Sequence, residues 1–86
     1  MFDKGTMQIA KIIKATPDKV GDYYDFPMKL YADIVLEASK YGISQYALEQ
    51  SLNRLPTQGL AMVFRSPNGA IIGIQPTDMF RNIFLN

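Results

Sequence analysis

The sequence predicts a single α+β domain that is mainly helical, with three helices, one β-hairpin and a short C-terminal helix. Two observations carry this prediction. Residues 28–41 and 44–55 show the apolar periodicity of amphipathic helices, and two β-rich runs flank a turn signal at residues 65–69. A chain of 86 residues has room for one hydrophobic core, so residues 1–86 are expected to form one domain. Apolar residues make up 48% of the chain and charged residues 20%, which is typical of a globular protein.

The first helix is expected at residues 7–15. Ile9, Ile12 and Ile13 follow the i, i+3, i+4 spacing that places side chains on one face of a helix. Thr6 is a candidate N-cap for this helix. Met7, Ile9 and Ile13 also fit the period of two that is typical of a strand, so a strand remains open as the alternative.

The two central helices carry the strongest signal. In residues 28–41 the apolar side chains fall on one arc of a helical wheel, and Gly42 ends the helix as a C-cap in the left-handed conformation. Ser44 is a favourable N-cap for the next helix, residues 44–55, which Pro56 closes. The charged side chains of helix 28–41 share the arc opposite its apolar side chains: Lys29, Asp33, Glu37 and Lys40.

A β-hairpin follows the helices. Its strands are expected at residues 60–64 and 70–74, and Pro67-Asn68-Gly69 lies between them. Proline presets one turn dihedral, while asparagine and glycine tolerate positive φ, so this tripeptide favours a tight turn.

The residue types that are absent exclude several kinds of chemistry. The chain has no cysteine and no histidine, which excludes disulfides, thiolate nucleophiles, Ser-His relays and metal sites built from these ligands. The neighbouring carboxylates Asp33 and Glu37 are flanked by lysines, which indicates a solvated charged face. We therefore expect no catalytic residue, no metal site and no cofactor. We also find no targeting segment and no apolar run long enough to cross a membrane, so we expect a soluble, cytoplasmic protein.

The segment around Gly42 resembles the turn of helix-turn-helix DNA-binding proteins. That family places a small residue where the helices cross, a glycine four residues later, an apolar plug, a Ser or Thr cap and an inward apolar residue. The matching residues here are Ala38, Gly42, Ile43, Ser44 and Leu48.

The hairpin that follows extends the resemblance to the winged helix family, and Ser51 departs from it because the family usually has a larger apolar residue there. The resemblance implies a three-helix winged-helix-like domain with a β-hairpin wing. It also implies a small DNA-binding regulator of transcription or an accessory protein, which reads the major groove with helix 44–55 and contacts the backbone or the minor groove with hairpin 60–74. The implied contact residues on double-stranded DNA are Lys40, Ser44, Gln45, Tyr46, Glu49, Gln50, Asn53, Arg54, Arg65 and Asn68.

The charge balance keeps a second hypothesis open. The formal net charge is only +1, so a monomer would make few phosphate contacts, and a DNA-binding form is expected to be a homodimer. The polar outer arc of helix 44–55 is also typical of any helix that faces solvent, with or without DNA binding. The alternative is a protein-binding module or inhibitor, such as a phage- or plasmid-type regulator that blocks a host protein without binding nucleic acid.

The alternative places the partner-binding surfaces on aromatic residues and on the hairpin. Residues 17–27 are expected to form a loop, and its acidic, aromatic middle either packs on the core or forms an exposed patch. The short last helix, residues 79–85, is capped by Thr77 or Asp78 and needs packing to be stable. The aromatic residues assigned to this surface are Tyr23, Tyr24, Phe26, Phe80 and Phe84.

Overall fold

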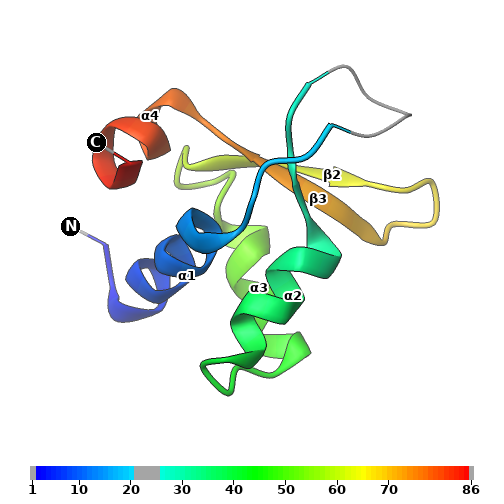
Figure 1. Cartoon of the computed structure of the whole chain (residues 1–86), viewed down its shortest axis with the longest axis horizontal. Coiled ribbons are helices and arrows are strands. Elements are labelled where there is room, and N and C mark those ends of the chain that lie inside the picture. Colours follow the sequence, from blue (N-terminus) through cyan, green and yellow to red (C-terminus); the bar gives the residue numbers. More distant parts are fainter. Residues whose placement is uncertain (1, 21–25, 86) are drawn as a thin grey trace.

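The computed structural model describes residues 2–20 and 26–85 as an α+β domain in which helices pack on one face of an antiparallel sheet (Figure 1). The sheet has three strands in the order β1-β3-β2. The elements in chain order are α1 (Lys4–Ala15), β1 (Lys29–Leu30), α2 (Tyr31–Ser39), α3 (Gln45–Arg54), β2 (Ala61–Arg65), β3 (Ile71–Pro76) and α4 (Asp78–Phe80), which continues as a π-helical turn over Arg81–Leu85. No helix among the described residues is long and apolar enough to span a membrane.

The hydrophobic core lies between the sheet and the inner faces of α1, α2 and α3. The predicted inner arcs of the two central helices are confirmed at Ile34, Ala38, Leu48 and Leu52, which are buried, whereas Tyr41 and Ala47 on the same arcs are exposed. The largest fully buried side chains of this core are Phe80, Ile12, Ile13, Ile34, Leu48, Leu52, Leu55, Leu60 and Ile74.

Helix α1 confirms the helical alternative for residues 7–15, and it begins three residues earlier than expected. The reason is the N-cap. The carboxylate of Asp3 accepts a hydrogen bond from the backbone N–H of Thr6 at 2.8 Å, so the helix starts at Lys4. The prediction that Thr6 is the cap is therefore wrong. Thr6 is buried in the first turn, where its hydroxyl accepts a hydrogen bond from the side-chain amide of Gln58 at 3.0 Å.

The expected helix 28–41 is shorter than predicted, because its first residues form a strand instead. Lys29 pairs with Ile74 and Leu30 with Gly73, both antiparallel, and the helix begins at Tyr31. Position 73 requires glycine at this contact. A Cβ there would lie 2.6 Å from the carbonyl oxygen of Lys29, which is closer than real Cβ atoms come to a neighbouring atom.

Lys29 was expected on the polar arc of a helix, and this expectation is wrong. Its side chain points inward from β1, and the residue is only 5% exposed. The ammonium group donates a hydrogen bond to the backbone carbonyl of Thr16 and forms an ion pair with Asp18 at 3.3 Å. These two contacts compensate the buried charge and connect β1 to the segment that leaves α1.

The β-hairpin is confirmed, with strands one to two residues later than predicted. Its register shifts between Phe64 and Arg65, and Gly69 takes a φ of +90° in the turn. The cap of the last helix is Thr77, whose hydroxyl accepts a hydrogen bond from the backbone N–H of Phe80 at 3.2 Å. Only the first turn of this element is α-helical, and the rest is the π-helical turn.

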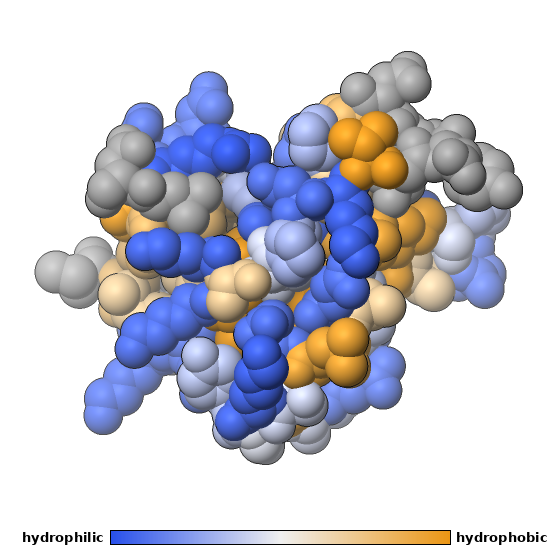
Figure 2. All heavy atoms as spheres, viewed as in Figure 1, coloured by the Kyte–Doolittle hydropathy of each residue, from blue (hydrophilic) through white to orange (hydrophobic). Residues whose placement is uncertain are grey.

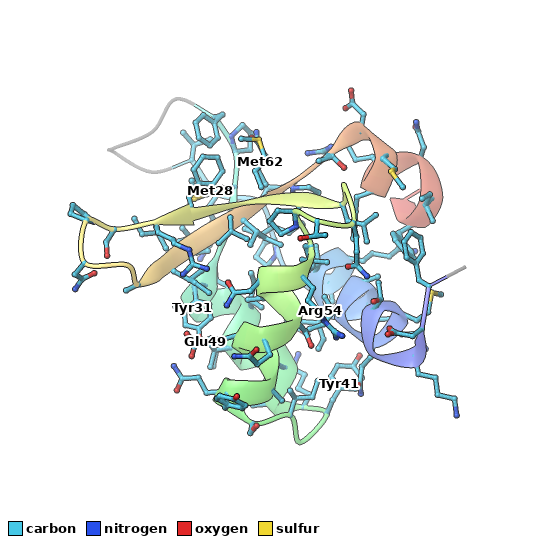
Figure 3. All side chains as sticks on the ribbon, turned by 180° about the vertical axis from the view of Figure 1, so that it is seen from behind. Met28, Tyr31, Tyr41, Glu49, Arg54 and Met62 are labelled. Carbon is cyan, nitrogen blue, oxygen red and sulfur yellow. The ribbon has the colours of Figure 1, made fainter. Side chains whose placement is uncertain are left out.

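The face of the sheet that is turned away from the helices carries a smaller apolar layer. Met28 is buried there, and the rings of Phe26 and Phe64 pack with their centroids 5.1 Å apart. Met62 lies on the same side as Met28 (Figure 3) and is 55% exposed, and Ile72 is also exposed. Part of this layer therefore faces solvent.

Candidate nucleic-acid interface

The turn between α2 and α3 brings the two helices together at small and apolar residues. Ala38 is buried, and Gly42 takes a φ of +69°, which a glycine adopts without steric cost. The hydroxyl of Ser44 accepts a hydrogen bond from the backbone N–H of Ala47 at 3.1 Å and so caps α3. Ile43 packs against the core next to the buried Leu48. The turn therefore holds α3 by its apolar side.

The polar side of α3 faces outward. Leu48 and Leu52 anchor the helix in the core, and the side chains on the opposite arc stay in solvent. Tyr46 is 74% exposed. The view in Figure 3 has α3 in front. Four predicted contact residues form one exposed strip along α3, which we call the α3 strip: Gln45, Tyr46, Gln50 and Asn53.

Two other predicted residues of α3 point elsewhere. Glu49 is half-buried, and with Gln45 it lies beside the hydroxyl of Tyr31 on α2. That hydroxyl is buried without a hydrogen bond of regular geometry among the described residues. Burial raises the pKa of Tyr31, Gln45 opposes this shift, and the carboxylate of Glu49 adds to it. Glu49 is thus turned toward α2 rather than outward.

Arg54 lies at the junction of α3 and α1. Its guanidinium group is near the first turn of α1, where Nη2 is 3.6 Å from the position that a Cβ of Gly5 would take. The pKa of Asp3 is lowered mainly by the hydrogen bond from the backbone N–H of Thr6, and the charge of Arg54 lowers it further. Arg54 therefore extends the charged surface toward α1 instead of completing the α3 strip.

The hairpin is tied to α3 through Arg65. One guanidinium nitrogen donates to the backbone carbonyl of Gly69 at 3.0 Å, and another donates to the side-chain carbonyl of Asn53 on α3. At the tip, the side-chain oxygen of Asn68 accepts a hydrogen bond from the backbone N–H of Ala70 at 3.2 Å. The contact between Asn53 and Arg65 has no sequence signal, because it depends on how closely β2 approaches α3. The structure thus joins the strip and the hairpin into one surface.

The remaining predicted contact residues have local partners. Lys40 is exposed and forms an ion pair with Glu37 at 3.0 Å, and Ser44 is used as the helix cap. Cations near the α3 strip are therefore few. Among the described residues, no group of three or more acidic side chains is arranged to hold a metal ion.

Of the aromatic residues assigned to the alternative hypothesis, the three that the structure describes pack in two different clusters. Phe80 is fully buried, so it is not available to a partner, because its ring packs on Phe84 with a centroid distance of 4.8 Å. Phe84 is half-buried and also packs on Phe2, and Phe26 packs on the outer layer of the sheet. Tyr23 and Tyr24 lie outside the described residues.

Comparison of the chain with protein-family models, with curated proteins and with solved structures finds no match. The assignment of a function therefore depends on the geometry and chemistry of the α3 strip and the hairpin.

Proposed function

We propose that this protein is a small DNA-binding protein of the winged-helix type, with a regulatory or accessory role. In this proposal α3 enters the major groove, and the β2–β3 hairpin lies against the backbone or in the minor groove. The observation that carries the proposal is the α3 strip, a row of exposed amide and aromatic side chains that begins at the capped end of a helix and meets the hairpin at Asn53. The order of three helices followed by a hairpin supports it.

The side chains of the strip suit recognition of base edges. The amides of Gln45 and Gln50 each offer a donor and an acceptor side by side, the pattern that adenine complements in the major groove. Asn53 is engaged by Arg65, so the two are expected to act as one unit, with the remaining guanidinium N–H groups directed to a phosphate or a base. Phosphate contacts of this kind set the register of the protein on the duplex.

The few cations near the strip make the expected affinity of a monomer low. Lys40, Arg54 and Arg65 are three candidates for phosphate contacts. Three contacts give a slope of about −3 for the logarithm of the binding constant against the logarithm of salt concentration. A homodimer on a two-fold site would double both the contacts and the slope, which makes the slope a measure of the number of copies bound.

Fluorescence anisotropy on a pool of duplexes of mixed sequence tests the proposal. We expect binding that weakens steeply with salt, and a loss of sequence preference in Gln50→Ala. The matched control is Gln8→Ala, because Gln8 is an exposed glutamine on α1 that lies outside the α3 strip. An absence of binding at about 50 mM salt with micromolar protein would contradict the proposal, since electrostatic contacts are strongest at low salt.

The second candidate function, a protein-binding module, is favoured by the outer layer of the sheet. Exposed Met62 lies on the same side of the sheet as Met28, where the rings of Phe26 and Phe64 pack, and exposed apolar side chains on such a face are typical of protein contacts. If this surface binds a partner, Met62→Lys should abolish the stoichiometric complex.

A further inference from the structure

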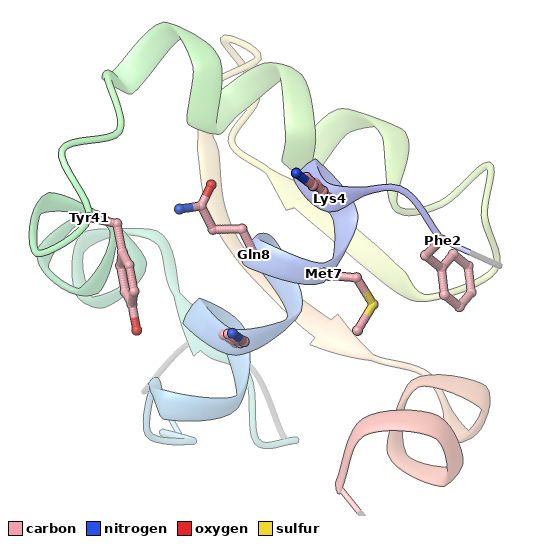
Figure 4. A pocket seen from close by; sticks show the side chains of 6 residues that line it. Phe2, Lys4, Met7, Gln8 and Tyr41 are labelled. Atoms are coloured by element: carbon pink, nitrogen blue, oxygen red, sulfur yellow. The ribbon is translucent and has the colours of Figure 1, made fainter.

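A second surface, separate from the α3 strip, lies along the outward side of α1. Lys4, Met7, Gln8 and Lys11 follow the i, i+3, i+4, i+7 spacing and form one stripe of this helix. The stripe lines a shallow hollow of about 500 Å³ that none of the residues of α3 lines. Figure 4 shows the hollow with Tyr41, from the turn after α2, at one end. Hydrophilic side chains also cover much of the face that α1 and α2 form (Figure 2).

Within the part of the chain that the structure describes, the two lysines of this stripe lack the acidic partners that most of the other lysines have. Lys19, Lys29 and Lys40 each form an ion pair with an acidic side chain. Lys4 and Lys11 form none among the described residues, so their charges are not compensated locally. An anionic ligand on this stripe would supply the missing partners.

The lining of the hollow is apolar in part. Met7 is 41% exposed and Tyr41 is 47% exposed, and both line the hollow together with Phe2. Exposed thioether and aromatic side chains gain stability when an apolar group covers them. The stripe thus carries two positive charges with Met7 and Gln8 between them, and the apolar side chains of Phe2 and Tyr41 line the two ends of the hollow.

We propose that this stripe docks an acidic amphipathic helix of a partner protein. Lys4 and Lys11 are seven residues apart on α1, which is about 10 Å along the helix axis. Carboxylates at positions i and i+7 of a second helix have the same separation, and apolar residues at i+3 and i+4 would then lie over Met7 and the hollow. A DNA backbone would match the lysines and leave Met7, Phe2 and Tyr41 in water, so a protein helix is the better fit.

The interface is small, so the expected binding is weak and fast. A single helix on a shallow hollow buries less than a standard protein interface, and we expect dissociation constants on the order of 100 μM for an isolated peptide. Titration followed by the backbone amide resonances of the protein detects binding in this range and locates it. The resonances of α1 and Tyr41 should shift, and those of the α3 strip should not.

The test uses a synthetic, alanine-based helix of about 20 residues with Glu at i and i+7 and Leu at i+3 and i+4. Lys11→Glu should weaken binding of this peptide about tenfold, because one attraction becomes a repulsion. The matched control is Lys14→Glu, which makes the same charge change on the same helix at an exposed lysine outside the hollow and should weaken binding less than twofold. A peptide with Gln in place of Glu should bind more weakly than the acidic one.

Three results would overturn the proposal. The first is an equal loss in Lys11→Glu and Lys14→Glu, which would indicate attraction by overall charge alone. The second is peptide-induced shifts that fall outside α1 and Tyr41. The third is a duplex DNA or an anionic vesicle that shifts the resonances of this stripe more strongly than the peptide does. Gln50→Ala should leave peptide binding intact, so a failure of the DNA-binding proposal does not affect this result.

Discussion

Replacement of Gly73 by alanine tests the close pairing of β1 with β3. Gly73 lies in the central strand β3, opposite Leu30 of β1 and Phe64 of β2. A Cβ at position 73 would lie 2.6 Å from the backbone carbonyl oxygen of Lys29 and 2.9 Å from the sulfur of Met28. The sulfur belongs to a flexible side chain and can move, but the carbonyl belongs to the backbone of β1. The new methyl group therefore has to displace the strand itself.

The size of the effect follows from this geometry. Ordinary contacts of a Cβ begin at 3.4 Å, so β1 would have to retreat by about 0.8 Å from the 2.6 Å position. Such a shift strains the pairing of β1 with β3 and disturbs the buried contacts of Lys29 and Met28. Overpacking of this kind costs about 3 kcal/mol of unfolding free energy. For a domain of this size, that corresponds to a fall in Tm of about 12 °C or more.

Thermal unfolding followed by circular dichroism measures this difference, and Gly5→Ala provides the matched control. A Cβ at Gly5 would meet its nearest neighbours, Arg54 and Asp3, at an ordinary 3.6 Å, and the position lies in the first turn of α1. Alanine favours a helix over glycine by about 0.5–1 kcal/mol, so this variant should be more stable than the parent. The reasoning is refuted if Gly73→Ala unfolds within about 3 °C of the parent protein.

Two further predictions concern polar contacts. Lys29→Met keeps the buried volume but leaves the backbone carbonyl of Thr16 without its hydrogen-bond donor. It should lower the unfolding free energy, measured by denaturant titration, by about 1–3 kcal/mol. An unchanged denaturation midpoint would contradict this role of Lys29. The pKa of Asp3 is lowered from its ordinary value of 3.8, mainly by the hydrogen bond from the backbone N–H of Thr6. The ionised carboxylate therefore stabilises the folded state fully above pH 3.8. This stabilisation is lost as the pH falls through the lowered pKa. Asp3→Asn should keep the helix cap and reduce the loss of unfolding free energy with falling pH below about pH 4. Acid unfolding curves identical to those of the parent protein would contradict this prediction.

Much of the helical framework follows from local signals in the chain. Ser44 caps α3 and Gly42 takes positive φ as expected, because capping and left-handed turns depend on residues close in sequence. The inward positions Ile34 and Leu48 are buried as their periodicity predicts. The start of α1 was missed because Thr6 and Asp3 are both acceptable caps, and the choice between them depends on Thr6 being needed in the core.

The candidate site was predicted in part. The outward strip of α3 follows from the same periodicity as its buried side, so Gln45, Tyr46, Gln50 and Asn53 are exposed together. The direction of the Arg54 side chain toward α1 could not be predicted from the sequence. The conformation of a long exposed side chain at a helix end depends on the charges that the fold places near it, here the carboxylate of Asp3. The burial of Phe80 likewise depends on the docking of the last helical turn against the core.

Local patterns in the 86 residues were thus enough to indicate the two central helices and the hairpin, since each depends on neighbours a few positions away, whereas they left residues 7–15 open between helix and strand. The fold alone established β1, the buried Lys29 and the link between Asn53 and Arg65. Each of these depends on atoms from distant parts of the chain: the backbone of β3, the carbonyl of Thr16 and the approach of β2 to α3. A strand of only two residues, Lys29 and Leu30, gives no strong local signal, and the hydrogen-bonding edge of β3 provides the partner that makes this segment extended.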